Sequence, residues 1–145
     1  MNIRRIANND SKVRSDLFSL LNDLLPEYSA RIKELEQGNS NLDLYVLEED
    51  NQVSGGLVAC TCKNSSYGFN HGSVLFAGVL NQKQGYGRAL VQTYARDLVK
   101  KDVPEIVLDV QKNSLGEQSA RKMGFKEFAR DDDGQIYLSA KPYEI

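Results

Sequence analysis

The strongest constraint on the fold is a buried-strand pattern that passes through two glycines into an amphipathic helix. Residues 73–80 are almost wholly apolar, as expected for a strand buried on both faces of a sheet. Residues 88–100 place apolar side chains at helical spacing along one face. Gly85 and Gly87 stand between the two segments. The pattern predicts a strand–turn–helix unit, and therefore a sheet with helices packed against it.

Further segments repeat both periodicities. Alternating or continuous apolar residues predict strands, and apolar residues three or four apart predict helices. The expected strands are residues 1–6, 42–47, 53–62, 73–80, 106–110, 125–129 and 136–140, and the expected helices are 11–25, 27–36, 88–100 and 114–123. Hairpin turns are expected at 50–51 and 131–134, and a polar loop around 64–66. This order predicts a mixed sheet combined with helices.

Length and charge exclude several classes of protein. A chain of 145 residues is near the commonest domain size, so residues 1–145 are expected to form one domain. The net charge of -2 gives no general attraction to nucleic acid. No apolar run is long enough to span a bilayer, and residues 1–5 lead into no signal-type stretch. We therefore expect a cytoplasmic protein without nucleic-acid or membrane partners.

The cysteines and the histidine give no basis for a metal site. Cys60 and Cys62 are the only cysteines, and His71 is the only histidine. Cysteines two residues apart on a strand point the same way and are poorly placed to bridge each other. A metal site would need more Cys or His ligands. We expect buried, reduced thiols and no metal.

The segment from Asn81 to Leu90 carries the predicted chemistry. Glycine permits a tight turn and leaves no Cβ in the way of a ligand. The first turn of a helix presents unpaired N–H groups with a partial positive charge, so a glycine-lined helix start suits a pyrophosphate. Two familiar motifs are incomplete here. The dinucleotide fingerprint needs a third glycine where Leu90 stands, and the P-loop needs Lys-Ser/Thr where Arg88 and Ala89 stand.

Two other motifs, defined by their residue spacing, match a family that uses neither of these phosphate-binding motifs. Gln82, Gly85 and Gly87 match the pattern Gln/Arg-x-x-Gly-x-Gly/Ala between a strand and a helix. Farther along, Asn113 follows an expected strand, and Gly124 stands eleven residues later at the end of a helix, followed by Phe. In both motifs and their order, the sequence resembles the GNAT superfamily of N-acetyltransferases. The resemblance covers most of the chain in topology.

The resemblance implies both a fold and an activity. The implied fold is α/β in the mixed α+β sense, with a mostly antiparallel sheet of six or seven strands and about four helices. The implied activity is that of an acyltransferase, which moves the acetyl group of its co-substrate acetyl-CoA directly to a primary amine of a small molecule or peptide. Dimers are frequent in the family, so a homodimer is one option.

The resemblance also assigns residues to the coenzyme. Backbone N–H groups of residues 84–89 would wrap the pyrophosphate, while Arg88 would add charge or simply be solvated. Asn113 would contact the pantetheine arm or, alternatively, cap the following helix. The implied cofactor-binding residues are Ala77, Gly78, Val79, Gln82, Gln84, Gly85, Tyr86, Gly87, Arg88, Ala89 and Asn113, and the catalytic candidates are Asn113 and His71.

Two positions depart from the family pattern. Residues 77–81 contain no proline, although the family usually has one before the Gln/Arg. Ala120 stands where many members have a tyrosine whose hydroxyl protonates the departing thiolate. A thiol with a pKa of about 8.5 can leave as its anion, so this loss should slow transfer rather than abolish it.

The residues that would receive the amine are less sharply marked. A histidine side chain can act as a base near neutral pH, but His71 is expected to be a solvated loop residue. Glu48 and Glu49 end a strand and are expected to be surface charges. Two tyrosines and one acidic run also stay open: Tyr67 and Tyr137 as pocket lining or packing, and residues 131–133 as an attractor of cations or a solvated turn.

Two rival functions remain open. The absence of a hydroxyl at Ala120 favours a non-catalytic acyl-CoA-binding or regulatory module. The glycine turn alone would also suit a nucleotide-binding protein. Turnover with a panel of amines separates the first rival from the enzyme, and a comparison of ATP, NAD and acetyl-CoA separates the second.

Overall fold

The computed structural model describes residues 1–38, 41–63, 68–82 and 84–145. Two compact units are present: Met1–Cys60 with Phe76–Val91, and Thr61–Leu75 with Gln92–Ile145. The elements in chain order are β1 (Asn2–Ile6), α1 (Ser11–Leu24), the 3₁₀-helix η1 (Pro26–Tyr28), α2 (Ser29–Gln37), β2 (Asp43–Glu49), β3 (Gln52–Cys62), β4 (His71–Val79), α3 (Tyr86–Lys100), β5 (Glu105–Gln111), α4 (Leu115–Lys122), β6 (Lys126–Arg130), β7 (Gln135–Ala140) and the 3₁₀-helix η2 (Pro142–Glu144). The hydrogen-bonded strand order is β1-β2-β3-β4-β5-β7-β6.

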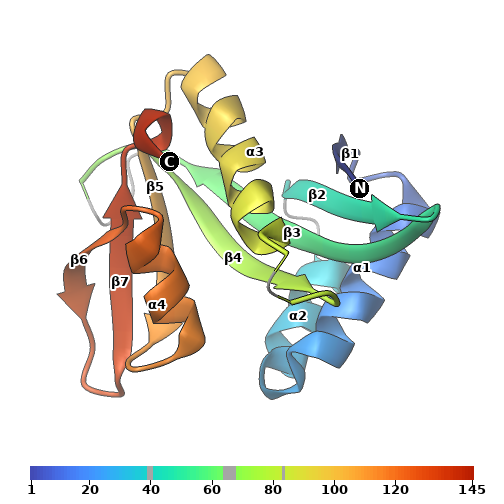
Figure 1. Ribbon diagram of the computed structural model, residues 1–145, viewed down its shortest axis with the longest axis horizontal. Helices are drawn as coiled ribbons and strands as arrows, with labels where there is room; N and C mark the ends of the chain where they lie inside the picture. The colour runs from blue at the N-terminus through green and yellow to red at the C-terminus, as the bar shows by residue number, and fades with distance from the viewer. Residues whose placement is uncertain (39–40, 64–67, 83) are drawn as a thin grey trace. The chain divides into compact units, whose positions relative to one another are not determined.

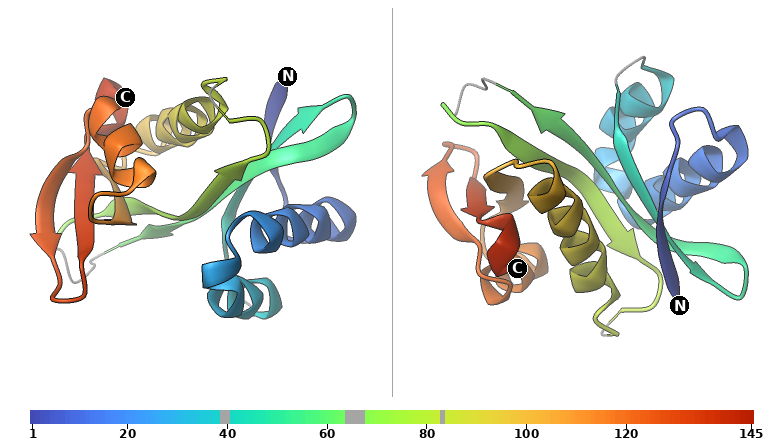
Figure 2. Two further views of the ribbon diagram at one scale, coloured as in Figure 1. Left: turned by 60° about the horizontal axis from the view of Figure 1, so that its bottom comes forward. Right: turned by 90° about the horizontal axis from the view of Figure 1, so that it is seen from above.

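The first unit is built around β2, whose residues Asp43 to Leu47 are all buried. Strands β1 and β3 pair with β2 antiparallel on its two sides. Helices α1 and α2 lie side by side against one face of β2 and β3 (Figures 1 and 2). Helix α1 and β3 approach so closely that a Cβ at Gly56 would lie 2.1 Å from a methyl carbon of Leu17. Glycine in this strand is therefore a requirement of the packing.

The second unit combines one parallel pair with antiparallel pairs. The start of β4 pairs parallel with β5 from His71–Glu105 to Val74–Leu108, and β7 pairs antiparallel with both β5 and β6. Helix α4 covers one face of β5, where Gly116 lies against Val110 (Figure 1). Because successive strand residues face opposite sides, Asp109 and its cross-strand partner Tyr137 lie on the face opposite α4.

The predicted fold class is confirmed. In the described part of the chain, seven strands form the mixed sheet, four α-helices accompany it, and the pairs β1–β2, β2–β3, β5–β7 and β6–β7 are antiparallel. The turn at Asp50 and Asn51 has left-handed backbone at both residues, as a tight hairpin requires. Among the described residues, no helix has the length and apolar character needed to cross a membrane.

Three local predictions need correction. The helix expected at residues 27–36 begins only at Ser29, because Pro26 starts a separate 3₁₀ turn. Strand β4 begins two residues earlier than expected, at His71, and its residues 75–78 are half-buried rather than buried on both faces. Cys60 and Cys62 form no disulfide, as expected, but both are half-buried. The polar loop expected at residues 64–66 lies outside the described residues.

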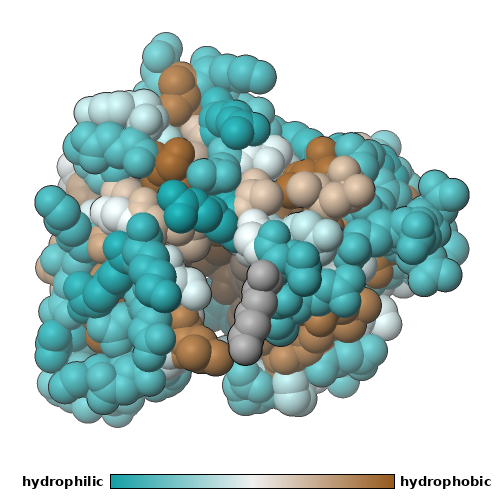
Figure 3. Space-filling view, viewed as in Figure 1, coloured by the Kyte–Doolittle hydropathy of each residue, from teal (hydrophilic) through white to brown (hydrophobic). Residues whose placement is uncertain are grey.

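Large apolar side chains also reach the surface at scattered places. Figure 3 shows a mostly hydrophilic face interrupted by separate hydrophobic groups. The exposed large apolar residues are Met1, Leu80, Val99, Leu115, Phe128 and Tyr143. They belong to different elements and connecting segments, and scattered exposure of this kind is normal in a folded protein.

Candidate functional site

The segment between β4 and α3 is held by its own hydrogen bonds. The N–H of Leu80 donates to the carbonyl of Ser54 on β3 at 2.8 Å. The side-chain amide of Gln82 donates to the carbonyl of Val79 at 2.9 Å. Gly85 has φ of +76°, in the left-handed region that favours glycine. Leu80 and Gln82 are thus tied to β3 and to the end of β4, and Gly85 turns the chain into α3.

The first turn of α3 presents backbone donors beside open space. The N–H of Ala89 donates to the carbonyl of Gly85 at 3.0 Å, so Gly85 precedes the helix and begins its hydrogen-bond ladder. The N–H groups of Tyr86, Gly87 and Arg88 have no earlier helical carbonyl to bond. A Cβ built at Gly87 meets no atom within 4 Å. This geometry fits an anionic group such as a pyrophosphate, which those N–H groups can approach closely.

A carboxylate next to this turn was not foreseen as part of the site. Glu49, at the end of β2, accepts hydrogen bonds at Oε1 from the hydroxyl of Ser54 and from the amide of Asn81, both at 2.8 Å. Its Oε2 lies 3.5 Å from the hydroxyl of Tyr86. The bonds from Ser54 and then Asn81 hold the pKa of Glu49 below its usual value. The expected surface charge therefore also accepts hydrogen bonds from Ser54 and Asn81.

The predicted coenzyme residues fall in both compact units. Residues 77–79, 82 and 84–89 belong to the first unit, which thus contains the whole glycine loop. Within it, Gln84 and Arg88 are exposed, and Gly78 packs against Leu24 of α1. Asn113 and His71 belong to the second unit.

Asn113 is not the helix cap, because Ser114 takes that role. The hydroxyl of Ser114 accepts a hydrogen bond from the N–H of Glu117 at 3.1 Å. Asn113 itself is exposed and has φ of +64°. Its backbone N–H donates to Oε1 of Glu117 at 2.7 Å. The capping alternative for Asn113 is therefore wrong, and its left-handed backbone sharpens the turn between β5 and α4.

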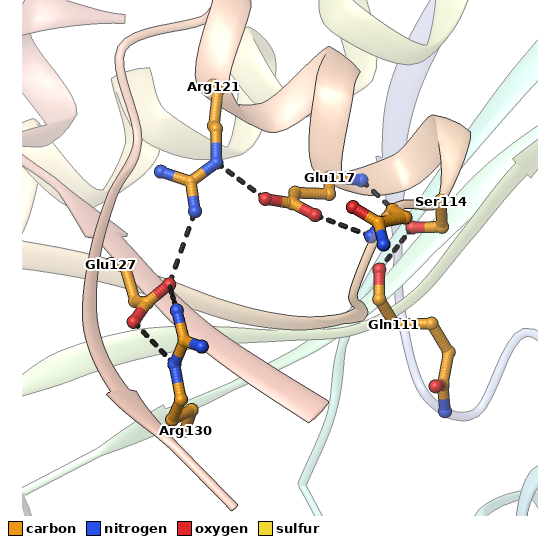
Figure 4. Close-up of polar contacts among 7 residues, drawn as sticks. Gln111, Ser114, Glu117, Arg121, Glu127 and Arg130 are labelled. Carbon is orange, nitrogen blue, oxygen red and sulfur yellow. Dashed lines mark hydrogen bonds and ion pairs between the residues drawn. The ribbon is translucent and has the colours of Figure 1, made fainter. Parts of the chain in front are cut away.

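Charged side chains link α4 to β6. Figure 4 shows Arg121 between two carboxylates, with Nε donating to Glu117 at 2.7 Å and a terminal nitrogen 3.3 Å from Glu127. Arg130 also donates to both oxygens of Glu127, at 2.7 and 2.9 Å. The bond from Asn113 N–H and then that from Arg121 hold the pKa of Glu117 below its usual value. This network fixes the position of α4 within the second unit.

His71 differs from the expected solvated loop residue. It is the first residue of β4 and only 2% exposed. Its Nδ1 lies 3.4 Å from the carbonyl of Phe69, and its ring meets the ring of Phe69 edge-on at a centroid distance of 5.7 Å. Aromatic packing in the second unit therefore buries this histidine.

The structure places most of the remaining residues that the sequence suggested for amine binding or for protonating the thiolate. Tyr137 is half-buried, and burial, followed by the charges of Asp131 and Asp109, raises its pKa. Asp131 shapes the hairpin turn by accepting the N–H groups of Asp133 and Gln135 at 2.9 and 3.0 Å. Ala120 is buried at 2% exposure. Tyr67 lies outside the described residues.

Comparisons with known proteins agree on the architecture. Neither a protein-family model nor a curated protein sequence matches the chain. An aminoglycoside 6'-acetyltransferase type Ii superposes with a TM-score of 0.77 at 16% identity, covering 98% of this chain and 97% of its own. Tetrahymena GCN5 gives a TM-score of 0.77 at 19% identity, with 100% and 98% covered. The PaiA N-acetyltransferase of Thermoplasma acidophilum, solved with coenzyme A, gives 0.71 at 17% identity, with 97% and 99% covered.

The fold conclusion follows from these likenesses and from the strand order. The matched structures are covered almost end to end, so the similarity concerns the whole arrangement rather than one motif. The glycine loop lies between β4 and α3, as the sequence pattern predicted. The chain has the fold of the GNAT acetyltransferases.

Proposed function

We propose that this protein is a GNAT-type N-acetyltransferase that moves the acetyl group of acetyl-CoA to a primary amine of a small molecule or peptide. The observation that carries the proposal is the open, glycine-lined start of α3. Gly85 makes the turn, and the hydrogen of Gly87 leaves the N–H groups of the first helical turn accessible. A pyrophosphate is the part of acetyl-CoA that such donors bind.

Other residues would hold the pantetheine arm and the thioester of acetyl-CoA. In this proposal the backbone of residues 77–79 pairs with the pantetheine arm, and Asn113 contacts the same arm through its amide. The N–H near Val79 polarises the thioester carbonyl and stabilises the negative charge that develops on its oxygen. Holding both reactants in one protein supplies a large part of the rate advantage through proximity.

The neutral amine attacks the carbonyl carbon directly; the amide bond forms, the carbon–sulfur bond breaks, and the nitrogen releases one proton to solvent. Because Ala120 has no hydroxyl, the thiolate leaves as its anion and takes its proton from solvent. An α-amino group, with a pKa of about 8, is partly neutral at pH 7.4, whereas a lysine-like amine, with a pKa of about 10.4, is almost wholly protonated. Amines of low pKa are therefore the expected better acceptors.

A panel of amines tests this proposal. Purified protein is incubated with acetyl-CoA and each amine, and the release of free thiol is followed over many turnovers. The enzyme predicts amine-dependent thiol release, and a mass increase of the amine by one acetyl group. If acetyl-CoA stabilises the protein against heat but no amine causes thiol release, the protein is not an enzyme of this kind, and a second candidate function applies.

That second candidate is a non-catalytic acyl-CoA-binding or regulatory module. It is favoured by Ala120, which is buried at 2% exposure where many GNAT enzymes carry the acidic hydroxyl. Both candidates need the same glycine loop, so both predict that acetyl-CoA raises the melting temperature more than ATP or NAD does.

A further inference from the structure

We propose that Glu49 is the positioning residue of the pyrophosphate loop. This inference rests on the proposed function, because it concerns the loop that would bind acetyl-CoA. Glu49 belongs to β2 and lies far from the loop in sequence, but its carboxylate bonds residues on both sides of it. Asn81 precedes Gln82, and Tyr86 follows Gly85. One carboxylate thus contacts both Asn81, after the end of β4, and Tyr86, the first residue of α3.

The carboxylate is itself anchored to the strand beneath it. Ser54 is only 7% exposed, and its hydroxyl donates to Oε1 of Glu49 at 2.8 Å. The carbonyl of the same serine accepts the N–H of Leu80, also at 2.8 Å. Ser54 therefore positions both Leu80, the residue after β4, and the carboxylate that holds Asn81. The hairpin of β2 and β3 serves as a rigid base for the turn.

This structural support matters because several N–H groups must point at the pyrophosphate at the same time. Fixing the backbone of each residue costs conformational entropy. A loop already held in the binding geometry avoids that loss when the ligand arrives, so preorganisation appears as affinity. Asn81 and Tyr86 are the two residues near the N–H donors of α3 that Glu49 contacts. The contacts of Glu49 therefore favour tighter binding of the coenzyme.

The negative charge of Glu49 would act in the opposite direction. A carboxylate near a diphosphate repels it, but at physiological ionic strength this repulsion between exposed charges is weakened by salt and falls off beyond about 8 Å. The contact of Glu49 with the first turn of α3 is to the hydroxyl at the end of the Tyr86 side chain. An ionised acceptor also forms stronger hydrogen bonds than a neutral one. Positioning should outweigh repulsion, which fixes the sign of the effect to be measured.

The test compares two neighbouring glutamates. Glu49→Ala removes the three contacts, whereas Glu48→Ala removes the same charge from a residue that pairs with Arg4 at 2.7 Å on β1. Titration calorimetry with acetyl-CoA should show a dissociation constant about tenfold higher for Glu49→Ala than for wild type, as expected for loss of hydrogen bonds to a charged group. Glu48→Ala should stay within about twofold. Glu49→Gln, which keeps a carbonyl for Ser54 and Asn81, should recover most of the affinity.

A truncated donor separates positioning from general damage to the protein. Acetyl-pantetheine lacks the pyrophosphate and the nucleotide, so it does not use the loop. Glu49→Ala should raise KM for acetyl-CoA while leaving kcat/KM for acetyl-pantetheine at the wild-type value. Equal losses with both donors would overturn the inference. If Glu49→Ala does not fold, Asn81→Ala removes one exposed contact and should raise KM for acetyl-CoA in the same selective way.

The remaining outcomes separate this inference from the function on which it rests. Wild-type protein that does not bind acetyl-CoA would overturn the proposed function, and the role of Glu49 with it. Wild-type protein that binds, with Glu49→Ala indistinguishable from Glu48→Ala, would overturn only the role of Glu49. Tighter binding by Glu49→Ala at low salt would show that repulsion dominates, and would also overturn it.

Discussion

The side-chain amide of Gln82 donates to the backbone carbonyl of Val79, 2.9 Å away. The first residue of the glycine motif thus closes the loop onto the strand that precedes it. Gln82→Ala should weaken acetyl-CoA binding about fivefold, since one net hydrogen bond contributes about 1 kcal/mol. Gln84→Ala keeps its backbone N–H and has an exposed side chain, so calorimetry should give near wild-type affinity for it. Equal affinities for the two variants would contradict the role of Gln82.

The two glycines of the motif should respond differently to alanine. Gly85 has φ of +76°, where an L-residue costs about 1–2 kcal/mol. Gly87 has open space at its Cβ position and no such backbone constraint. Gly85→Ala should therefore lower the melting temperature by about 2–4 °C or more, while Gly87→Ala should leave it nearly unchanged. Differential scanning calorimetry checks both variants, and a reversed order would contradict this conformation of the loop.

Ser114 is expected to stabilise α4 through its hydroxyl. It accepts the N–H of Glu117 and donates to the carbonyl of Gln111 at 2.6 Å (Figure 4). Ser114→Ala should destabilise the protein by about 1 kcal/mol, as loss of an N-cap usually does. Ser119→Ala, an exposed position in the same helix, is the matched control and should have little effect. Chemical denaturation measures both, and equal midpoints would rule out the cap.

The stabilisation from Glu117 should depend on pH. The N–H of Asn113, followed by the guanidinium of Arg121, holds its pKa below the ordinary value of 4.5. A lowered pKa in the folded state gives stability that is fully present above the unfolded-state pKa and is lost as pH falls through the folded-state pKa. Glu117→Gln should therefore lower the melting temperature at pH 7, and the gap to wild type should close below pH 4.5. A gap that stays constant from pH 7 to pH 3 would contradict this.

Local sequence patterns predicted the helices and strands, because each helix or strand is determined mainly by residues that are close together in the sequence. The apolar run that became β4, the helical spacing of α3 and the glycines between them all lie within one continuous segment. The order of strands and helices followed from such segments, and the fold class was confirmed. Boundaries were less accurate where tertiary contacts intervened, as at His71, which pairs with Glu105 of β5 and whose ring packs against Phe69.

Contacts between distant segments left no trace in the sequence. Glu49 looked like a surface charge, because its bonds to Asn81 and Tyr86 depend on how the hairpin of β2 and β3 meets the loop. Ser114 and Asn113 are adjacent and both suit a cap, so only the backbone angles decided between them. The roles of Asn113 and His71 in catalysis stay predictions.

The most direct test of the account is acetyl-CoA binding to Gly87→Val, measured by titration calorimetry beside wild type and Gly87→Ala. Nothing in the protein lies within 4 Å of the Cβ position, so the valine should fold normally and place its methyl groups where the pyrophosphate would approach the N–H groups of α3. The account predicts that wild-type protein binds acetyl-CoA. In Gly87→Val the affinity should fall at least about a hundredfold, which corresponds to a steric clash of about 3 kcal/mol. The melting temperature should be nearly unchanged. Wild-type affinity in a folded Gly87→Val would contradict the central claim that these main-chain donors hold the coenzyme.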